Sequence, residues 1–261
     1  MKIGIFGGGF KPFTTGHFAK LAKAIDDNDR VFLFYGLQKP AKIGKRGKPL
    51  AQHGLRGIGD TGRKYTAELS RKIFDIYEQA IEREFPNVEV ESTIGSSPWT
   101  RTFEIIQEFA ENPDLYDSVI VYGDINTIRH YLRRKRYFGN LLDTGKLQLG
   151  AITPESPNDY LDEDTLLKMA ERSEEHHLDA LEKYYPGVSR DELARIQQVR
   201  GTEVRQLASV DETTEEAKRF LPPFLKDDEK QKIIDLLTGS DSEQPLPENY
   251  IRYLIRGMIR G

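Results

Sequence analysis

The first 17 residues of this 261-residue chain constrain its fold more than any other stretch. Residues 2–6 form a short apolar run with no charge after Lys2, which favours a β-strand. Glycines at positions 7–9 end such a strand, and from Phe18 onwards apolar residues recur at helical spacing. A helix N-terminus that is reached through glycines offers free backbone N–H groups to an anion. The stretch therefore predicts a strand, a turn that can approach a phosphate, and a helix.

The rest of the chain continues the alternation of strands and helices. A helix over 16–26 leads into a nearly continuous apolar run at 30–36, which is typical of a strand buried in a parallel sheet. Further strands are predicted at 88–93, 117–124 and 146–153, and further helices at 65–84 and 126–136. This succession indicates an α/β fold with a parallel five-stranded sheet and helices on both faces.

Residues 155–198 break this pattern, with highly charged helices predicted at 159–177 and 190–198. We therefore expect one domain made of 1–154 and 199–237, with a helical insertion at 155–198. Helices are also predicted at 212–218 and 227–237, and the part from 238 to 261 is expected to be a linker and an amphipathic helix. Adjacent histidines on a helix point in different directions, so His176 and His177 are expected at the surface and not in a metal site.

Residues 9–17, with Gly8 before them, read Gly-Phe-Lys-Pro-Phe-Thr-Thr-Gly-His. They resemble the G-x-F-x-P-x-[HT]-x-G-H signature of the cytidylyltransferase-like nucleotidyltransferases. This superfamily includes nicotinamide-mononucleotide and pantetheine-phosphate adenylyltransferases and CTP:alcohol-phosphate cytidylyltransferases. The resemblance implies a Rossmann-like fold in which Thr14 and His17 bind nucleotide phosphates and stabilise the transition state. It implies nucleotide contacts for Gly8, Gly9, Phe10 and Lys11, although Lys11 stands where the family often has Asp, Asn or Gln.

A second segment, 199–205, reads Val-Arg-Gly-Thr-Glu-Val-Arg. It resembles the family's second signature, I-S-[SGT]-T-x-[IV]-R, and above all the Ser-Gly-Thr-Glu-Ile-Arg form of some adenylyltransferases. The resemblance implies that Gly201 and Thr202 open a helix that holds phosphates, and that the Arg205 guanidinium faces the triphosphate. Arg200 stands where the family usually has Ser. Taken alone, each of the two segments is also compatible with an ordinary capped helix start.

Four further candidate residues follow the ends of predicted strands, which form the edge where open α/β sheets bind ligands. The loop 38–49 carries five basic residues, of which Lys39 and Lys42 are candidates for phosphate binding; a solvated loop is the alternative. Asp124 is a candidate for a ribose or substrate contact, or else a helix N-cap. Trp99, in a Gly/Ser/Pro loop, could stack on a flat substrate or could anchor the loop on the domain.

Composition narrows the classes of protein that remain. The chain has no cysteine, which excludes disulfides and thiolate nucleophiles, and we expect a cytoplasmic protein. No apolar run approaches the ~20 residues of a membrane span, and no signal peptide is recognised. A net charge of −4 makes nucleic acid an unexpected partner.

These observations predict nucleotidyl transfer, in which a phosphate-bearing small molecule such as nicotinamide mononucleotide attacks the α-phosphate of a nucleoside triphosphate. The resemblance favours ATP, and Mg²⁺ is expected to arrive with the nucleotide, since no carboxylate cluster suggests a dedicated metal site. A CTP-dependent cytidylyltransferase acting on an alcohol or sugar phosphate stays open, and a homo-oligomer is compatible with the sequence.

Two alternatives come from other classes of protein. A class I aminoacyl-tRNA-synthetase-like enzyme shares a related signature, but this chain lacks a Lys-Met-Ser-Lys-Ser loop. A non-catalytic nucleotide-binding or assembly protein would need neither His17 nor Arg205, so the presence of both argues against it.

Overall fold

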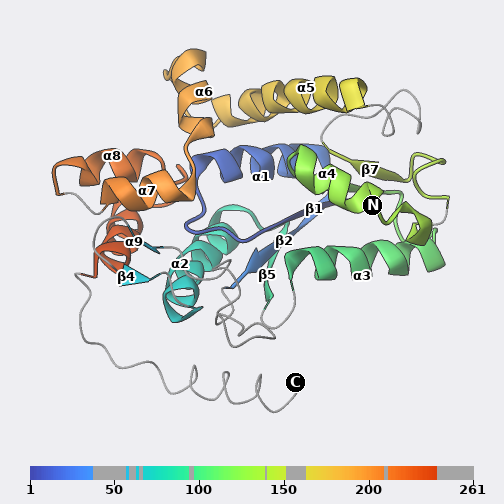
Figure 1. The fold of residues 1–261 in the computed structure, drawn as a ribbon, viewed down its shortest axis with the longest axis horizontal. Helices are drawn as coiled ribbons and strands as arrows, with labels where there is room; N and C mark the ends of the chain where they lie inside the picture. Colours follow the sequence, from blue (N-terminus) through green and yellow to red (C-terminus); the bar gives the residue numbers. More distant parts are fainter. Residues whose placement is uncertain are drawn as a thin grey trace, which may run out of the picture.

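A parallel sheet of five strands forms the centre of the protein (Figure 1). The computed structural model describes residues 1–37, 57–58, 63–64, 67–93, 97–138, 140–150, 163–208 and 211–239. The strands are β1 (Lys2–Gly8), β2 (Arg30–Gly36), β5 (Val88–Thr93), β6 (Ser118–Tyr122) and β7 (Leu147–Leu149). They lie in the order β5-β2-β1-β6-β7, and every neighbouring pair is parallel. The predicted α/β fold with a five-stranded parallel sheet is confirmed.

The position of each strand in the sheet agrees with its sequence pattern. β1 lies in the middle and is buried without a break from Ile3 to Phe6, because helices cover the sheet on both faces. β5 lies at the edge and alternates between apolar residues and glutamates, since one of its faces meets water. β7 ends at Leu149 because Gly150 follows with a φ of 95°, a left-handed conformation that suits glycine.

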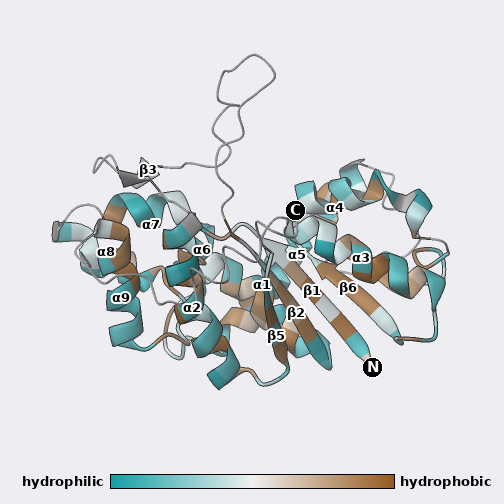
Figure 2. Cartoon of the chain, turned by 90° about the horizontal axis from the view of Figure 1, so that it is seen from below, coloured by the Kyte–Doolittle hydropathy of each residue, from teal (hydrophilic) through white to brown (hydrophobic). Residues whose placement is uncertain are grey.

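Helices pack on both faces of the sheet (Figure 2). Helices α1 (Thr15–Asp27) and α2 (Ala67–Glu84) cover one face, and α3 (Pro98–Glu111) and α4 (Ile125–Leu132) cover the other. The chain winds outwards from β1 in one direction and from β6 in the other. The strand order therefore reverses between β1 and β6, and ligands of such sheets bind at this point, beyond the carboxyl ends of the strands.

The remaining helices extend this body on the side of α1 and α2. Helices α5 (Glu163–Glu182) and α6 (Arg190–Gln198) form the described part of the predicted insertion, and α5 lies along α1 (Figure 1). The predicted helical C-terminal region is confirmed by α7 (Gly201–Ala208), α8 (Thr214–Arg219) and α9 (Asp227–Thr238). Short elements complete the list: β3 (Gly57–Ile58), β4 (Arg63–Lys64) and two 3₁₀ turns at Lys135–Tyr137 and Asp211–Thr213.

The division into a domain and an insertion stays a prediction, and the predicted helix 248–259 lies outside the described residues. Among the described helices, none has the length and apolar character needed to cross a bilayer.

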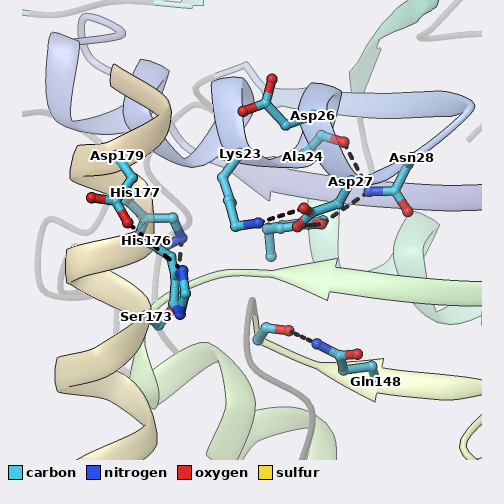
Figure 3. Close-up of polar contacts among 12 residues, drawn as sticks. Lys23, Ala24, Asp26, Asp27, Asn28, Gln148, Ser173, His176, His177 and Asp179 are labelled. Atoms are coloured by element: carbon cyan, nitrogen blue, oxygen red, sulfur yellow. Dashed lines mark hydrogen bonds and ion pairs between the residues drawn. The ribbon is translucent and has the colours of Figure 1, made fainter. Parts of the chain in front are cut away.

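The prediction for the histidine pair on α5 is wrong for one of its two members. The side chain of His176 is 46% exposed, whereas His177 is only 2% exposed because it faces α1 (Figure 3). The Nε2 atom of His177 lies 3.5 Å from the Ser173 hydroxyl, and Nδ1 has no hydrogen-bond partner among the described residues. Burial, together with the charges of Lys20 and Lys23, lowers the pKa of His177 to about 3. The error arose because α5 continues to Glu182 and packs on α1, which a local reading of a charged segment does not reveal.

This burial predicts a pH-dependent stability. An unfolded histidine titrates near 6.5, so between pH 6.5 and 3 the unfolded chain binds a proton that folded His177 does not bind. The free energy of unfolding should therefore fall as the pH drops through this window, by up to about 1.4 kcal/mol per pH unit for each such histidine. Urea titrations of His177→Gln should show a smaller decline than the unchanged protein, and His176→Gln should leave the decline as it is. Equal declines in all three proteins would contradict the assignment.

Candidate functional site

The glycine turn at the carboxyl end of β1 leaves main chain open at the point where the strand order reverses. Gly9 is exposed, and a Cβ atom built on it would meet no atom within 4 Å. At Gly8, in contrast, a Cβ atom would lie 2.4 Å from the Phe10 ring, so no larger residue fits there without moving that ring. The turn thus combines an accessible peptide at Gly9 with a closely packed one at Gly8.

Two buried phenylalanines anchor the loop that follows this turn in the hydrophobic core. Phe10 and Phe13 are 2% and 0% exposed, and their ring centroids are 4.7 Å apart. The Tyr35 hydroxyl donates to the Phe10 carbonyl at 2.7 Å, and the Tyr77 hydroxyl donates to the Phe13 carbonyl at 2.8 Å. The ring of Phe10, predicted to contact a nucleotide, therefore belongs to the core, and it packs edge-on against His17 with centroids 4.9 Å apart.

Thr14 and His17 are joined in the first turn of α1. Thr14 is the N-cap, and its backbone N–H donates to Nδ1 of His17 at 2.9 Å; the Thr14 hydroxyl lies at the same distance from Nδ1. Because Nδ1 accepts from a backbone N–H, the proton of a neutral ring must be on Nε2. Burial, and the charge of Lys20 one turn further along α1, lower the pKa of His17 to about 3. At neutral pH His17 is therefore an uncharged hydrogen-bond donor through Nε2.

The second predicted segment lies directly against the first. Arg205 is 1% exposed, and its Nη1 donates to the backbone carbonyl of Lys11 and, at 3.0 Å, to that of Gly201. Its Nη2 donates to the hydroxyl of Thr202 at 3.0 Å. The guanidinium, expected to face a triphosphate, thus binds main chain of the loop 9–14 and the start of α7. The structure brings Lys11, Gly201, Thr202 and Arg205 together.

Two glycines allow this close approach of the two segments. A Cβ atom on Gly16 would lie 2.1 Å from the Gln197 carbonyl oxygen, and one on Gly201 would lie 2.5 Å from the Lys11 carbonyl oxygen. Both obstacles are backbone atoms, which move less readily than the end of a side chain. Gly16 belongs to the first segment and Gly201 to the second, so each segment contributes the glycine that lets the other pack against it.

Thr15 ties the same helix start to two more distant parts of the chain. Its hydroxyl lies 3.0 Å from the Tyr185 hydroxyl, and both its backbone N–H and its hydroxyl donate to the carbonyl of Phe220, at 2.9 and 3.2 Å. Sequence reasoning missed Tyr185, because the contact spans 170 residues and no local pattern marks it. The helical segment 163–198 therefore helps to fix the first turn of α1.

Asp124 and Trp99 lie on the β6 side of the site. Asp124 is exposed and caps α4, where its Oδ1 accepts from the backbone N–H and the hydroxyl of Thr127, both at 2.8 Å. Trp99 was expected in a loop, but it lies in the first turn of α3, because Ser97 caps that helix and Pro98 begins it. The centroid of the indole lies 3.7 Å from the centroid of the His130 ring on α4. Trp99 thus packs between two helices near the ends of the strands.

Two predicted residues cannot be placed, and besides Tyr185 a further residue, Lys20, was missed. Lys39 and Lys42 lie outside the described residues. Lys20 was missed because it stands inside the apolar pattern of α1, although its spacing of three residues from His17 is a signal that could have found it. Lys20 is half-buried, and burial lowers its pKa against the opposing influence of Asp124 and Glu174.

Comparisons with known proteins show a distant similarity among solved structures. No protein-family model matches the chain, and no curated protein matches it. Among solved structures, one similar chain is described as a bifunctional NMN adenylyltransferase/ADP ribose pyrophosphatase from Francisella tularensis. It has a TM-score of 0.31 and 13% sequence identity, over 84% of this chain and 55% of that chain. This chain therefore spans about half the length of that structure, and we carry over no residue role from it.

The contact at Gly16 predicts that a substitution normally favourable in a helix is harmful here. In an exposed helix interior, Gly→Ala stabilises by about 1 kcal/mol. Gly16→Ala should instead lower the free energy of unfolding by about 1–3 kcal/mol, because the methyl group would overlap the Gln197 carbonyl. Guanidinium titrations of Gly16→Ala and of the control Gly9→Ala, whose methyl would meet open space, measure the difference. A stability of Gly16→Ala at or above that of the unchanged protein would rule out the close packing described.

Proposed function

We propose that this protein is a nucleotidyltransferase, in which a phosphate oxygen of a small-molecule acceptor attacks the α-phosphate of a nucleoside triphosphate and pyrophosphate leaves. The observation that supports this most is the meeting of 9–17 with 199–205. The Arg205–Lys11 contact joins residues 194 positions apart, and it lies beyond the end of β1 where the strand order reverses. The resemblance of both segments to one family was noted from the sequence, and their contact in space is an independent observation.

The proposed reaction depends on positioning the reactants and stabilising the phosphate charge more than on a protein nucleophile. The exposed main chain at Gly9, just before α1, is the part of the loop that a phosphate would approach. His17 would donate its Nε2–H to an oxygen of the transferring phosphoryl group, where negative charge grows as pyrophosphate departs. Thr14 would act through His17, since its backbone N–H fixes the tautomer that makes Nε2 the donor.

Arg205 takes a supporting part in this proposal. Its bonds to Lys11, Gly201 and Thr202 hold the peptides that would surround the phosphates in a fixed geometry. Among the described residues, no three His, Asp or Glu side chains are grouped so as to hold a metal ion. Mg²⁺ would thus come with the triphosphate as part of the substrate and neutralise some of its charge. Lys39 and Lys42 are further candidates for binding its phosphates.

The identities of the nucleotide and of the acceptor are proposed from the family resemblance alone. The Gly-Thr-Glu-Val-Arg stretch at 201–205 favours ATP, and nicotinamide mononucleotide is the first acceptor to test, with pantetheine phosphate next. CTP with an alcohol or sugar phosphate is the second pair. Asp124 would accept from a ribose hydroxyl through Oδ2, because its Oδ1 already caps α4.

One observation favours a second candidate, a nucleotide-binding protein without catalysis. The sequence argument against such a protein was that it would need neither His17 nor Arg205. The structure gives Arg205 a role in holding two segments together, which a binding protein would need as much as an enzyme. The distinction between the two functions then depends on His17.

Pyrophosphate release separates the two candidates. We expect the protein with Mg²⁺, ATP and one acceptor from a panel of phosphate compounds to release pyrophosphate. His17→Ala should lower the rate about 10²–10³-fold, as expected when a donor to a developing oxyanion is removed. His176→Ala, on an exposed histidine, should leave the rate unchanged. Nucleotide binding without release for any pair of nucleotide and acceptor would support the binding protein instead.

The state of His17 also predicts the pH profile of the reaction. Because burial and Lys20 lower the pKa of His17 to about 3, the ring stays neutral from pH 5 to pH 8. The value of kcat/KM should therefore show no inflection near 6.5, where an ordinary histidine titrates. Initial rates across this range test the expectation, and an inflection that disappears in a His17 variant would overturn it.

A further inference from the structure

A row of polar side chains runs along α1 from His17. His17, Lys20 and Lys23 follow one another at intervals of three residues, so they lie on one side of the helix. All three are half-buried, and α5 packs against α1. Such a row inside an otherwise apolar helix requires partners for its polar groups.

Within the part of the chain that the structure describes, the first and the third member of the row have bonded partners and the second has none. His17 accepts the N–H of Thr14, and Lys23 forms an ion pair with Asp27 (Figure 3). Among the residues that the structure describes, Lys20 makes no hydrogen bond and no ion pair. A half-buried ammonium loses hydration without a bonded partner in return, and such groups call for an explanation.

Two carboxylates act on Lys20 from a distance. Asp124 lies at the end of β6 and Glu174 on α5, and both favour the charged form of Lys20 without forming an ion pair with it. Lys20 itself lies one helical turn from His17 on α1, the helix against which α5 packs.

Two groups of the site that could carry positive charge do not offer it to a ligand. His17 is neutral, and the guanidinium of Arg205 is buried against main-chain carbonyls. The charge of Lys20 acts on the His17 ring from one helical turn further along α1. A phosphate bound at Nε2 of His17 would therefore also be attracted by the charge of Lys20.

We propose that Lys20 binds a phosphate oxygen of the nucleotide next to His17. This inference rests on the proposed function for the identity of the ligand. It extends the site to a residue outside both sequence signatures. The bond is a charge-assisted hydrogen bond from Nζ to a phosphate oxygen.

Lys20→Met tests the proposal, with Lys23→Met on the same side of α1 as the matched control. Calorimetric titration with Mg²⁺–ATP should show binding weakened at least 10-fold in Lys20→Met and less than 2-fold in Lys23→Met. Lys20→Arg should recover most of the affinity. Adenosine, which has no phosphate, should bind all four proteins equally.

Thermal unfolding distinguishes this role from a structural one. Since Lys20 is half-buried without a bonded partner, Lys20→Met should unfold at the same temperature as the unchanged protein or at a higher one. A lower melting temperature accompanied by unchanged binding of Mg²⁺–ATP would assign Lys20 to the fold alone.

The outcomes also separate this inference from the proposed function. Phosphate-dependent binding that is lost in Lys20→Met, without pyrophosphate release from any pair, would support Lys20 and reject the transferase. Pyrophosphate release with unchanged kinetics and affinity in Lys20→Met would support the transferase and reject the role of Lys20. Failure of the unchanged protein to bind Mg²⁺–ATP, Mg²⁺–CTP and pyrophosphate would overturn the inference about Lys20.

Discussion

The bond between the Arg205 guanidinium and the Lys11 carbonyl holds together the parts of the chain on which the candidate site depends. A buried guanidinium is costly unless its N–H groups are bonded, and here they bind carbonyls of both segments and the Thr202 hydroxyl. The contact therefore fixes α7 against the loop that follows β1. Gly16 and Gly201 allow the approach, because at either position a Cβ atom would overlap a backbone carbonyl. Charge, packing and backbone geometry thus specify the same arrangement.

Around this contact the site is supported from several directions. Tyr35 and Tyr77 bind the loop carbonyls from the core, and Tyr185 and Phe220 bind Thr15 from the helical segments. Loop peptides fixed in this way pay little conformational entropy when a ligand binds, which favours precise positioning of a phosphate. The space beside Gly9 remains open, since a Cβ atom there would meet no atom within 4 Å. The candidate site thus combines a scaffold fixed by many contacts with an open peptide at Gly9 and a neutral imidazole at His17.

The sequence predicted the sheet well because its signals are local. Apolar runs at 30–36 and 117–124 mark buried strands, and a glycine turn before an apolar helix marks the ligand edge. Thr14 and His17 were singled out by the resemblance of 9–17 to a family signature, and the structure places them in contact. The sequence did not predict that Arg205 binds the Lys11 carbonyl, that His177 is buried, or that Tyr185 contacts Thr15. Each of these contacts depends on residues far away in the chain. Trp99 was placed in a loop because Pro98 suggested a break, whereas proline is well accommodated in the first turn of a helix.

The distance along the chain between the two signature segments has a consequence for how the protein is made. Loop closure over 194 residues is a non-local event, so this contact cannot form early from local structure. During synthesis the strand β1 and the helix α1 emerge first, and their partner Arg205 emerges after all five strands of the sheet. Until then the carbonyl of Lys11 and the flank of Gly16 face solvent or a chaperone. The contact between the two signature segments is therefore completed only after the sheet has been synthesised, and a nascent chain that stops before α7 would carry all five strands without that contact.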